Sequence, residues 1–239
     1  MATLLQTNEL FKTHPDALRI AVYNDDIEVG NPLGSKAGVN KLTMYYYSIL
    51  NCPNRSNLSA IHLAMIAHSS DVKEFGHAKV LKPLINDLKS LENGVILMGQ
   101  CEKVYGTVVH LPGDNLAANE TQGFVGSFSA NHFCRFCKMH LTETRHIKRE
   151  DPSLLRNVDD HKNDVLSSHA SSEHGVKGSC IFDELKYFKA VESFCPDIMH
   201  DIFEGIAKKE VGLLLTHLIS SKTIALDELN GIIKSFNYG

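Results

Sequence analysis

Residues 18–26 read Leu-Arg-Ile-Ala-Val-Tyr-Asn-Asp-Asp, an apolar run that ends in two adjacent carboxylates. Apolar and β-branched residues over so short a length predict a buried strand over residues 18–23, which runs into Asn24, Asp25 and Asp26 so that the acids lie at the strand end. Residues 41–50, with the sequence KLTMYYYSIL, have the aromatic and β-branched content of a second strand. The stretch between them is dense in turn residues, so we expect a hairpin with a long loop.

Three further segments predict two more strands and a helix. Residues 58–67 form another apolar run of strand length, and residues 72–91 have apolar positions at helical spacing, with Pro83 as a kink or first-turn residue. Residues 103–111 predict a fourth strand, and Asp114 comes after it and a Pro-Gly turn. We therefore expect an α/β fold in which a mixed sheet, flanked by helices, brings carboxylates from separate strands together at one edge.

The second half of the chain is organised differently. Residues 115–129 predict a helix, whereas residues 130–180 are polar and rich in histidine and serine, which is typical of an insertion. Pro196 opens an amphipathic helix, and residues 225–236 predict another. We expect four parts: a lead-in over 1–17, a core over 18–129, a partly flexible Cys/His-rich insertion over 130–180, and a helical C-terminal part over 181–239.

Composition narrows the class of protein. With 239 residues and 43% hydrophobic content, the chain can bury a core. It has neither an apolar run of 18 residues nor a signal-peptide pattern, so we expect an intracellular protein, nuclear or cytoplasmic, that is not secreted and has no membrane partner. The net charge of −4 means that any DNA contact must be local. Nucleotide-binding and Gly-x-Ser-x-Gly motifs are missing, which disfavours nucleotide hydrolysis and acyl transfer.

The acids Asp25, Asp26 and Asp114 are candidates for a catalytic metal site. Carboxylates from separate strands can hold two ions about 3.5–4 Å apart, which activate an attacking water or 3′-hydroxyl and stabilise the leaving oxygen of a phosphodiester. Mg²⁺ and Mn²⁺ suit such an oxygen-rich site. Aspartate is also common where turns begin, so spacing alone leaves a structural role open for all three.

Cys134 and Cys137 form a Cys-x2-Cys pair, which is half of a zinc site. The remaining ligands would come from four candidates: His140, Cys195, Asp197 and His200. Asp197 and His200 stand three residues apart on the helix that Pro196 opens, so both project from one face. In the alternative reading Asp197 offsets the helix dipole and His200 is an ordinary surface or core histidine.

The most basic stretch of the chain lies in the predicted insertion. Its candidate DNA contacts are Arg135, Lys138, Arg145 and Lys148. Such a stretch could follow a phosphate backbone. It could equally be a solvated loop whose charge is balanced by neighbouring acids, and the sequence leaves both readings open.

Four separated motifs occur in one order along the chain. They are YNDDIE with NPLGS over 23–28 and 31–35, GDNLA over 113–117, CRFC over 134–137, and PDIMHDIFEG over 196–205. In this order they resemble transposase-derived proteins of animals, related to the CACTA/Mirage/Chapaev group of DDE transposases. The resemblance runs from about Leu18 to Val211. It implies an RNase H-like core with Asp25 as the first catalytic acid, or Asp26 as its alternative, and Asp114 as the second.

The resemblance also implies metal binding outside the acid site. The pairs Cys134/Cys137 and Asp197/His200 match an element that holds zinc in relatives such as the V(D)J recombinase, where the metal braces the insertion against the core. The third acid of the family is a glutamate on a later helix, and we expect the chain to stop before it. The stand-ins are Glu204, Glu210 and Glu228.

The function that the resemblance implies is that of a fragment of a cut-and-paste DNA transposase core. By descent it would cleave and join phosphodiesters with DNA as its partner, and it would be inactive alone; self-association is a further expectation. One alternative is a zinc-braced interaction module without catalysis. Another is an intact nuclease that uses Glu204 or Glu210 as its third metal ligand.

Overall fold

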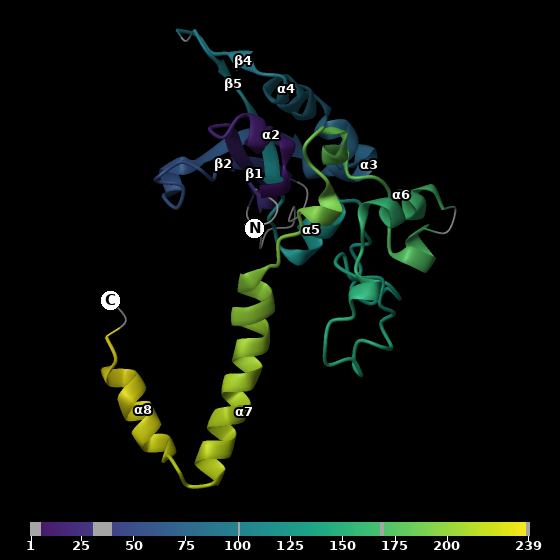
Figure 1. Ribbon diagram of the computed structural model, residues 1–239. Coiled ribbons are helices and arrows are strands. Elements are labelled where there is room, and N and C mark those ends of the chain that lie inside the picture. Colours follow the sequence, from purple (N-terminus) through teal and green to yellow (C-terminus); the bar gives the residue numbers. More distant parts are fainter. Residues whose placement is uncertain (1–5, 31–39, 100, 168–169, 238–239) are drawn as a thin grey trace. The chain divides into compact units, whose positions relative to one another are not determined.

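The computed structural model describes residues 6–30, 40–99, 101–167 and 170–237 (Figure 1). The NPLGS segment, residues 31–35, therefore lies outside the described residues. Contacts divide the chain into two compact units, Met1–Cys195 and Pro196–Gly239, so residues 181–195 belong with the first unit rather than with the C-terminal helices. None of the described helices is both long and apolar enough to cross a membrane.

The first unit contains six strands and a set of mostly short helices among its described residues. The strands are β1 (Leu18–Glu28), β2 (Lys41–Ile49), β3 (Ile61–His68), β4 (Val95–Ile96), β5 (Lys103–Val104) and β6 (Gly106–His110). The α-helices are α2 (Glu9–Thr13), α3 (Ser69–Val80), α4 (Lys82–Glu92), α5 (Asn115–Thr121) and α6 (Val158–Leu166). Short 3₁₀ or π turns are η1 (Leu58–Ala60), η2 (Pro152–Leu154), η3 (Ala170–His174), η4 (Ile181–Glu184) and η5 (Ala190–Glu192).

Four of the strands form one mixed sheet in the order β3-β2-β1-β6. The β1–β2 and β2–β3 pairs are antiparallel, whereas β6 runs parallel to β1, with Gly106 opposite Leu18. A Cβ on residue 106 would lie 2.9 Å from the Leu18 Cβ, so this close approach requires glycine. The predicted α/β class, with a mixed sheet flanked by helices, is confirmed. The single strand predicted over 103–111 is divided into β5 and β6, and β5 pairs with β4 in a separate two-stranded ribbon.

Strand β1 continues beyond the apolar run that predicts it. Asp25 pairs with Met44 and Asp26 with Thr43, so both acids lie within the strand and not after it. Antiparallel pairing with β2 satisfies their backbone groups, while their side chains stay exposed at the end of the hairpin. Because side chains alternate along a strand, Asp25 and Asp26 project from opposite faces of the sheet.

The helical segment predicted over 72–91 forms two helices. Gly76 has φ 78° and ψ 156°, which interrupts the helical backbone inside α3. A second break occurs at Leu81, and Pro83 lies in the first turn of α4, where a missing N–H costs little. The helical backbone between Ser69 and Glu92 is therefore interrupted at two points, Gly76 and Leu81.

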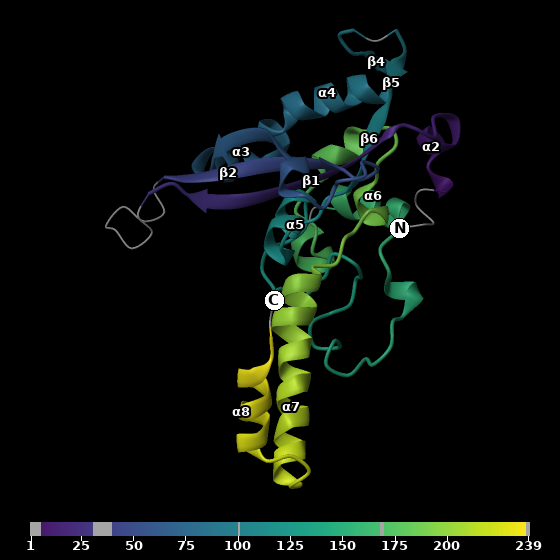
Figure 2. The same ribbon diagram turned by 90° about the vertical axis from the view of Figure 1, so that its left-hand side faces the viewer.

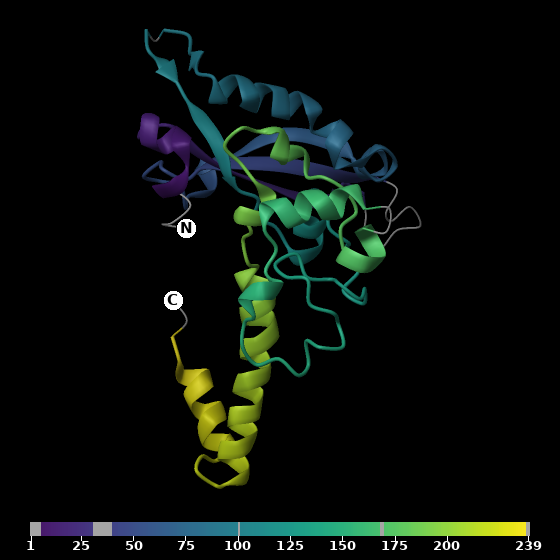
Figure 3. The same ribbon diagram turned by 45° about the vertical axis from the view of Figure 1, so that its right-hand side comes forward.

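The main core lies between the sheet and α4. Val108 of β6 packs there with Ile20, Val22 and Tyr45, and α4, which contacts β6, lies on one side of the sheet (Figures 2 and 3). The neighbouring Val109 belongs to a second cluster with residues of α2. Since adjacent strand residues face opposite ways, α4 and α2 cover opposite faces of the sheet.

The second unit is helical throughout its regular structure. A π-helical segment, η6 (Ile198–Ile206), leads directly into α7 (Ala207–Ser220), and α8 (Leu226–Ser235) comes after a short turn. The helices predicted from Pro196 onward and over 225–236 are confirmed. Glu204 lies in η6, Glu210 in α7 and Glu228 in α8, all within this unit.

We predict that Ile85→Ala lowers the free energy of unfolding by about 2 to 5 kcal/mol, because it leaves a cavity around a fully buried side chain of α4. Denaturant unfolding measures the loss. Leu58→Ala is the matched control, since Leu58 is 85% exposed, and it should change stability by less than about 0.5 kcal/mol. Equal losses from the two variants would contradict the placement of α4 against the sheet.

Candidate functional site

A cleft of about 250 Å³ opens where β1 and β2 meet α3 and α5. Its lining residues are Asn24, Asp25, Asp26, Lys41, Thr43, Ser69, Val72, Lys73, His77, Asp114, Leu116, Ala117 and Glu120. All three acids predicted as catalytic therefore line one cleft, although Asp114 is far from the other two in the sequence. This convergence of carboxylates is the central feature of the site.

Asp26 is held by the strand and helix beside it. Its Oδ1 accepts a hydrogen bond of 2.6 Å from the hydroxyl of Thr43, which is itself 3.0 Å from the Ser69 hydroxyl at the start of α3. Its Oδ2 lies 3.5 Å from the amine of Lys41. Residues directly opposite in a sheet project to the same side, so Asp26 and Thr43 share a face and the carboxylate has a fixed direction.

Asp25 is oriented differently. Its Oδ1 accepts a hydrogen bond of 2.8 Å from the backbone N–H of the next residue, Asp26, so this oxygen stays close to its own strand. It projects from the face opposite to Asp26 and Thr43. Both acids line the cleft, and the hydrogen bonds favour Asp26 as the carboxylate that faces α3.

Asp114 is the N-cap of α5. Its Oδ1 accepts a hydrogen bond of 2.6 Å from the backbone N–H of Ala117, the arrangement that Asp favours at a helix start. At the other end of α5, the Thr121 hydroxyl donates to Asn24 Oδ1 at 2.7 Å. Asn24 precedes the two acids of β1, so this bond fastens α5 beside them.

Four charged or titratable residues of the cleft escaped prediction from the sequence: Lys41, Lys73, His77 and Glu120. His77 Nδ1 lies 2.9 Å from the hydroxyl of Tyr45, within hydrogen-bond distance. Burial lowers the pKa of His77, while the nearby Asp26 carboxylate raises it in part. Burial also raises the pKa of Tyr45, so the phenol stays protonated. The spacing of these four residues in the sequence does not indicate a shared site, because only the fold brings them to the same cleft.

The chemistry of the donors in the cleft fits a hard divalent cation. Carboxylate and hydroxyl oxygens are the ligands that Mg²⁺ prefers, and Mg²⁺ commonly uses one or two carboxylates and keeps several waters. Among the residues that the structure describes, no three His, Cys, Asp or Glu side chains are grouped closely enough to hold an ion. The acids of the cleft therefore suit a site with two protein carboxylates better than a closed protein cage.

The predicted zinc pair lies in the first unit. Burial raises the pKa of the Cys137 thiol, and the adjacent thiol of Cys134 raises it further, so the two sulfurs are neighbours. His140 Nδ1 lies 2.9 Å from the Thr142 hydroxyl, and its ring meets that of His132 edge to face. Asp197 and His200, two of the residues predicted to complete the zinc site, belong to the second unit.

Asp197 and His200 contact each other. Asp197 caps η6 through a hydrogen bond of 3.1 Å from the His200 N–H to its Oδ1. Its Oδ2 also lies 2.5 Å from His200 Nδ1. These contacts correspond to the structural reading of the pair, in which the aspartate caps the helix and orients the histidine.

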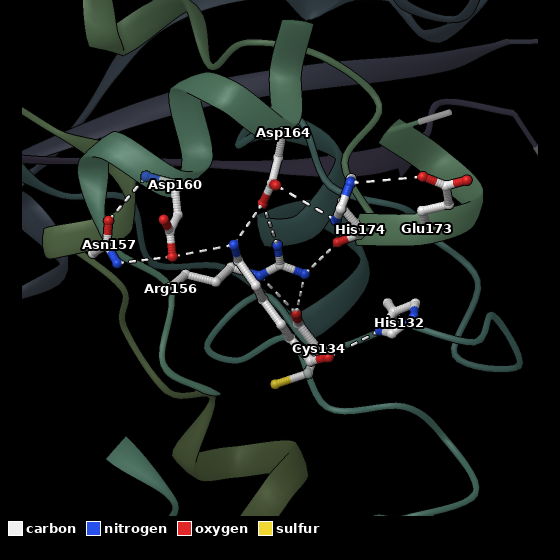
Figure 4. A network of polar contacts seen from close by, with 9 residues as sticks. His132, Cys134, Arg156, Asn157, Asp160, Asp164, Glu173 and His174 are labelled. Atoms are coloured by element: carbon white, nitrogen blue, oxygen red, sulfur yellow. Dashed lines mark hydrogen bonds and ion pairs between the residues drawn. The ribbon is translucent and has the colours of Figure 1, made fainter. Parts of the chain in front are cut away.

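The segment that contains the cysteines is built around a buried arginine (Figure 4). The Arg156 side chain is fully buried, and it donates to the carbonyl oxygens of Cys134 and His174. Asp164 of α6 lies 3.7 Å from the Arg156 guanidinium and 3.3 Å from the Lys138 amine. In Figure 4 the Cys134 thiol points away from the guanidinium. One cation thus connects three parts of the predicted insertion.

The predicted DNA contacts divide into two groups. Arg135 is only 3% exposed, and it donates to Asn115, Asn119 and the carbonyl of Cys195, so its guanidinium connects elements of the fold and does not form an outer surface. The Lys138 amine is engaged by Asp160 and Asp164. Arg145 and Lys148 are exposed and remain candidates for phosphate contact.

We predict that Arg156→Met lowers the free energy of unfolding by about 3 to 5 kcal/mol, because it leaves the Asp164 carboxylate and two carbonyls without their buried cation. Hydrogen exchange should rise over residues 132–140. Arg149→Met removes an exposed arginine from the same region and is the control. Stability loss no greater than in this control would mean that Arg156 does not organise the segment.

In comparisons with known proteins, no family model matches the chain, and no curated protein matches it at a significant level.

Proposed function

We propose that this chain is the core of a metal-dependent enzyme that cuts and joins the phosphodiesters of DNA, related by descent to cut-and-paste transposases. The strand order β3-β2-β1-β6 supports an RNase H-like core, because three antiparallel strands, two helices and a parallel fourth strand succeed one another in the order expected for it. The four motifs along the sequence support the same descent.

The observation that carries the proposal is the shared cleft of Asp26 and Asp114. Both side chains line it, and each is oriented by a hydrogen bond of its own, from Thr43 and from the Ala117 N–H. A protein that used these acids only to start turns has no reason to gather them in one concave site. Asp25 at the same cleft is the alternative first acid.

In the proposed mechanism Asp26 and Asp114 would hold Mg²⁺ or Mn²⁺. When bound, the ion supplies Lewis-acid activation and neutralises charge on the phosphodiester. Thr43 and Ser69 keep the Asp26 carboxylate turned toward the cleft, and Lys41 offsets its charge when the site holds no ion. Tyr45 positions His77, which burial keeps neutral near pH 7, at the wall beside Asp26.

Under this proposal we expect the chain alone to cleave DNA slowly or not at all. A second ion needs a further carboxylate, and the described residues form no group of three metal-binding side chains. Glu120 lines the cleft, and Glu204, Glu210 and Glu228 lie in the second unit, so each is a candidate for testing. A nuclear location, a DNA partner and self-association belong to the same proposal.

A zinc-braced interaction module is the second candidate, favoured by the adjacent thiols of Cys134 and Cys137. It predicts about one zinc per chain in metal analysis of the purified protein, lost in Cys134→Ser. It also predicts no dependence of Mn²⁺ binding on Asp26 or Asp114. Zinc analysis and Mn²⁺ titration of the same samples therefore distinguish the two proposals.

We predict that Asp26→Asn and Asp114→Asn each weaken Mn²⁺ binding by about tenfold or more, because each removes one of two charged ligands. Asparagine retains the acceptor that Thr43 uses and is as good an N-cap as aspartate, so both variants should fold normally. Titration calorimetry or Mn²⁺ paramagnetic resonance measures the binding.

Asp87→Asn on α4 is the control, since it removes an exposed carboxylate outside the cleft. It should leave Mn²⁺ affinity unchanged. Asp25→Asn in the same series decides which acid of β1 is the ligand. Mn²⁺ affinity equal to that of the unaltered chain in both Asp26→Asn and Asp114→Asn would refute the proposed function.

A further inference from the structure

A second cleft, of about 420 Å³, continues from the acid cleft. The two share four wall residues: Val72, Lys73, His77 and Glu120. From there the second cleft runs along α3 to Lys177 and Gly178, which come after η3 in the sequence. The two clefts are therefore adjacent, and we refer to them together as the trough, whose lining includes the acids and the two lysines.

Two residues that line this trough, Gly76 and Gly178, have no side chain. Gly76 has a positive φ of 78°, and a Cβ built there, or on Gly178, would meet no atom within 4 Å. Gly76 also interrupts α3 where the trough passes it. Glycine in such positions lets a ligand approach the protein backbone closely. At these two positions, therefore, no side chain stands between a ligand and the backbone.

Lys177 is presented from a rigid base. Its backbone N–H donates to the Gly123 carbonyl at 2.7 Å, and the preceding Val176 forms a β-bridge with Phe124. Gly123 and Gly178 are in such close contact that a Cβ on Gly123 would lie 2.2 Å from the Gly178 oxygen. The base of the side chain is therefore fixed, while its residue is exposed to the trough.

Lys73 faces the same trough from α3 and is also exposed. Neither lysine has an ion-pair partner among the described residues, in contrast to Lys82 and Lys89, which share Glu184. The one acid of the second cleft is Glu120. The charged residues that line the second cleft therefore sum to a net positive charge, whereas those of the acid cleft sum to a negative charge that a bound divalent cation would neutralise.

A DNA strand fits this arrangement, because it carries one phosphate at each nucleotide. We propose that Lys73 and Lys177 hold a backbone phosphate of the DNA strand whose reacting phosphodiester lies at the acid end. The two lysines are positioning residues, since they set which linkage reaches the acids and do not touch the reacting atoms. This inference rests on the proposed function.

Binding of a fluorescein-labelled single-stranded DNA, followed by anisotropy in EDTA at several salt concentrations, tests the proposal. Lys73→Ala and Lys177→Ala should each weaken binding at least about threefold and reduce the slope of log Kd against log salt by about 0.7. Lys→Arg at either position should restore binding. Glu120→Gln should strengthen it, because it removes the one acid that lines the second cleft.

Lys79→Ala is the matched control, since Lys79 also lies on α3 but its amine sits over the Phe75 ring and outside both clefts. It should leave the salt slope unchanged. Equal losses in all three lysine variants, or no binding by the unaltered chain at low salt, would overturn the inference. Because EDTA removes divalent ions, this result is independent of the Mn²⁺ titration, so failure here and failure of the acid site are distinguishable.

Discussion

The parallel pairing of β6 with β1 is the constraint on which the site depends. It places His110 opposite Ala21, and Asp25 and Asp114 each lie four residues further along their own segments. Two strands that run in the same direction bring their C-terminal ends, and the residues next to those ends, to the same edge of the sheet. Gly106 makes this pairing possible, because any side chain there would collide with Leu18. The bond from Thr121 to Asn24 then fixes α5, and with it Asp114, beside the acids of β1.

Much of the sheet could be predicted from the sequence, because apolar runs of strand length are strong local signals. The strands from Lys41 and Ile61 appear where expected, and so does the antiparallel hairpin of β1 with β2. The extension of β1 through Asp25 and Asp26 could not be predicted, since pairing with β2 overrides the weak strand preference of aspartate. The break in α3 lies at Gly76, whose positive φ the helical spacing of the neighbouring apolar residues does not indicate.

The site was predictable only in part, for a similar reason. Acids next to the ends of strands carry a local signal, and Asp26 and Asp114 were found by it. His77, Lys73 and Lys177 carry none, because their roles arise from contacts between segments distant in sequence. For Arg135 the charge pattern left two readings open, phosphate contact or a solvated loop, whereas burial and three hydrogen-bond acceptors give its side chain a structural role. Composition likewise gave no sign that Arg156 would order a polar segment.

The central claim is that Asp26 and Asp114 hold one divalent cation between them. Diffraction from crystals grown with Mn²⁺, recorded near the manganese absorption edge, tests it directly. The account predicts an anomalous peak within about 2.0–2.3 Å of a carboxylate oxygen from each residue, with waters completing the coordination. A peak bound by only one of the two acids, or no peak in the cleft at saturating Mn²⁺, would contradict it.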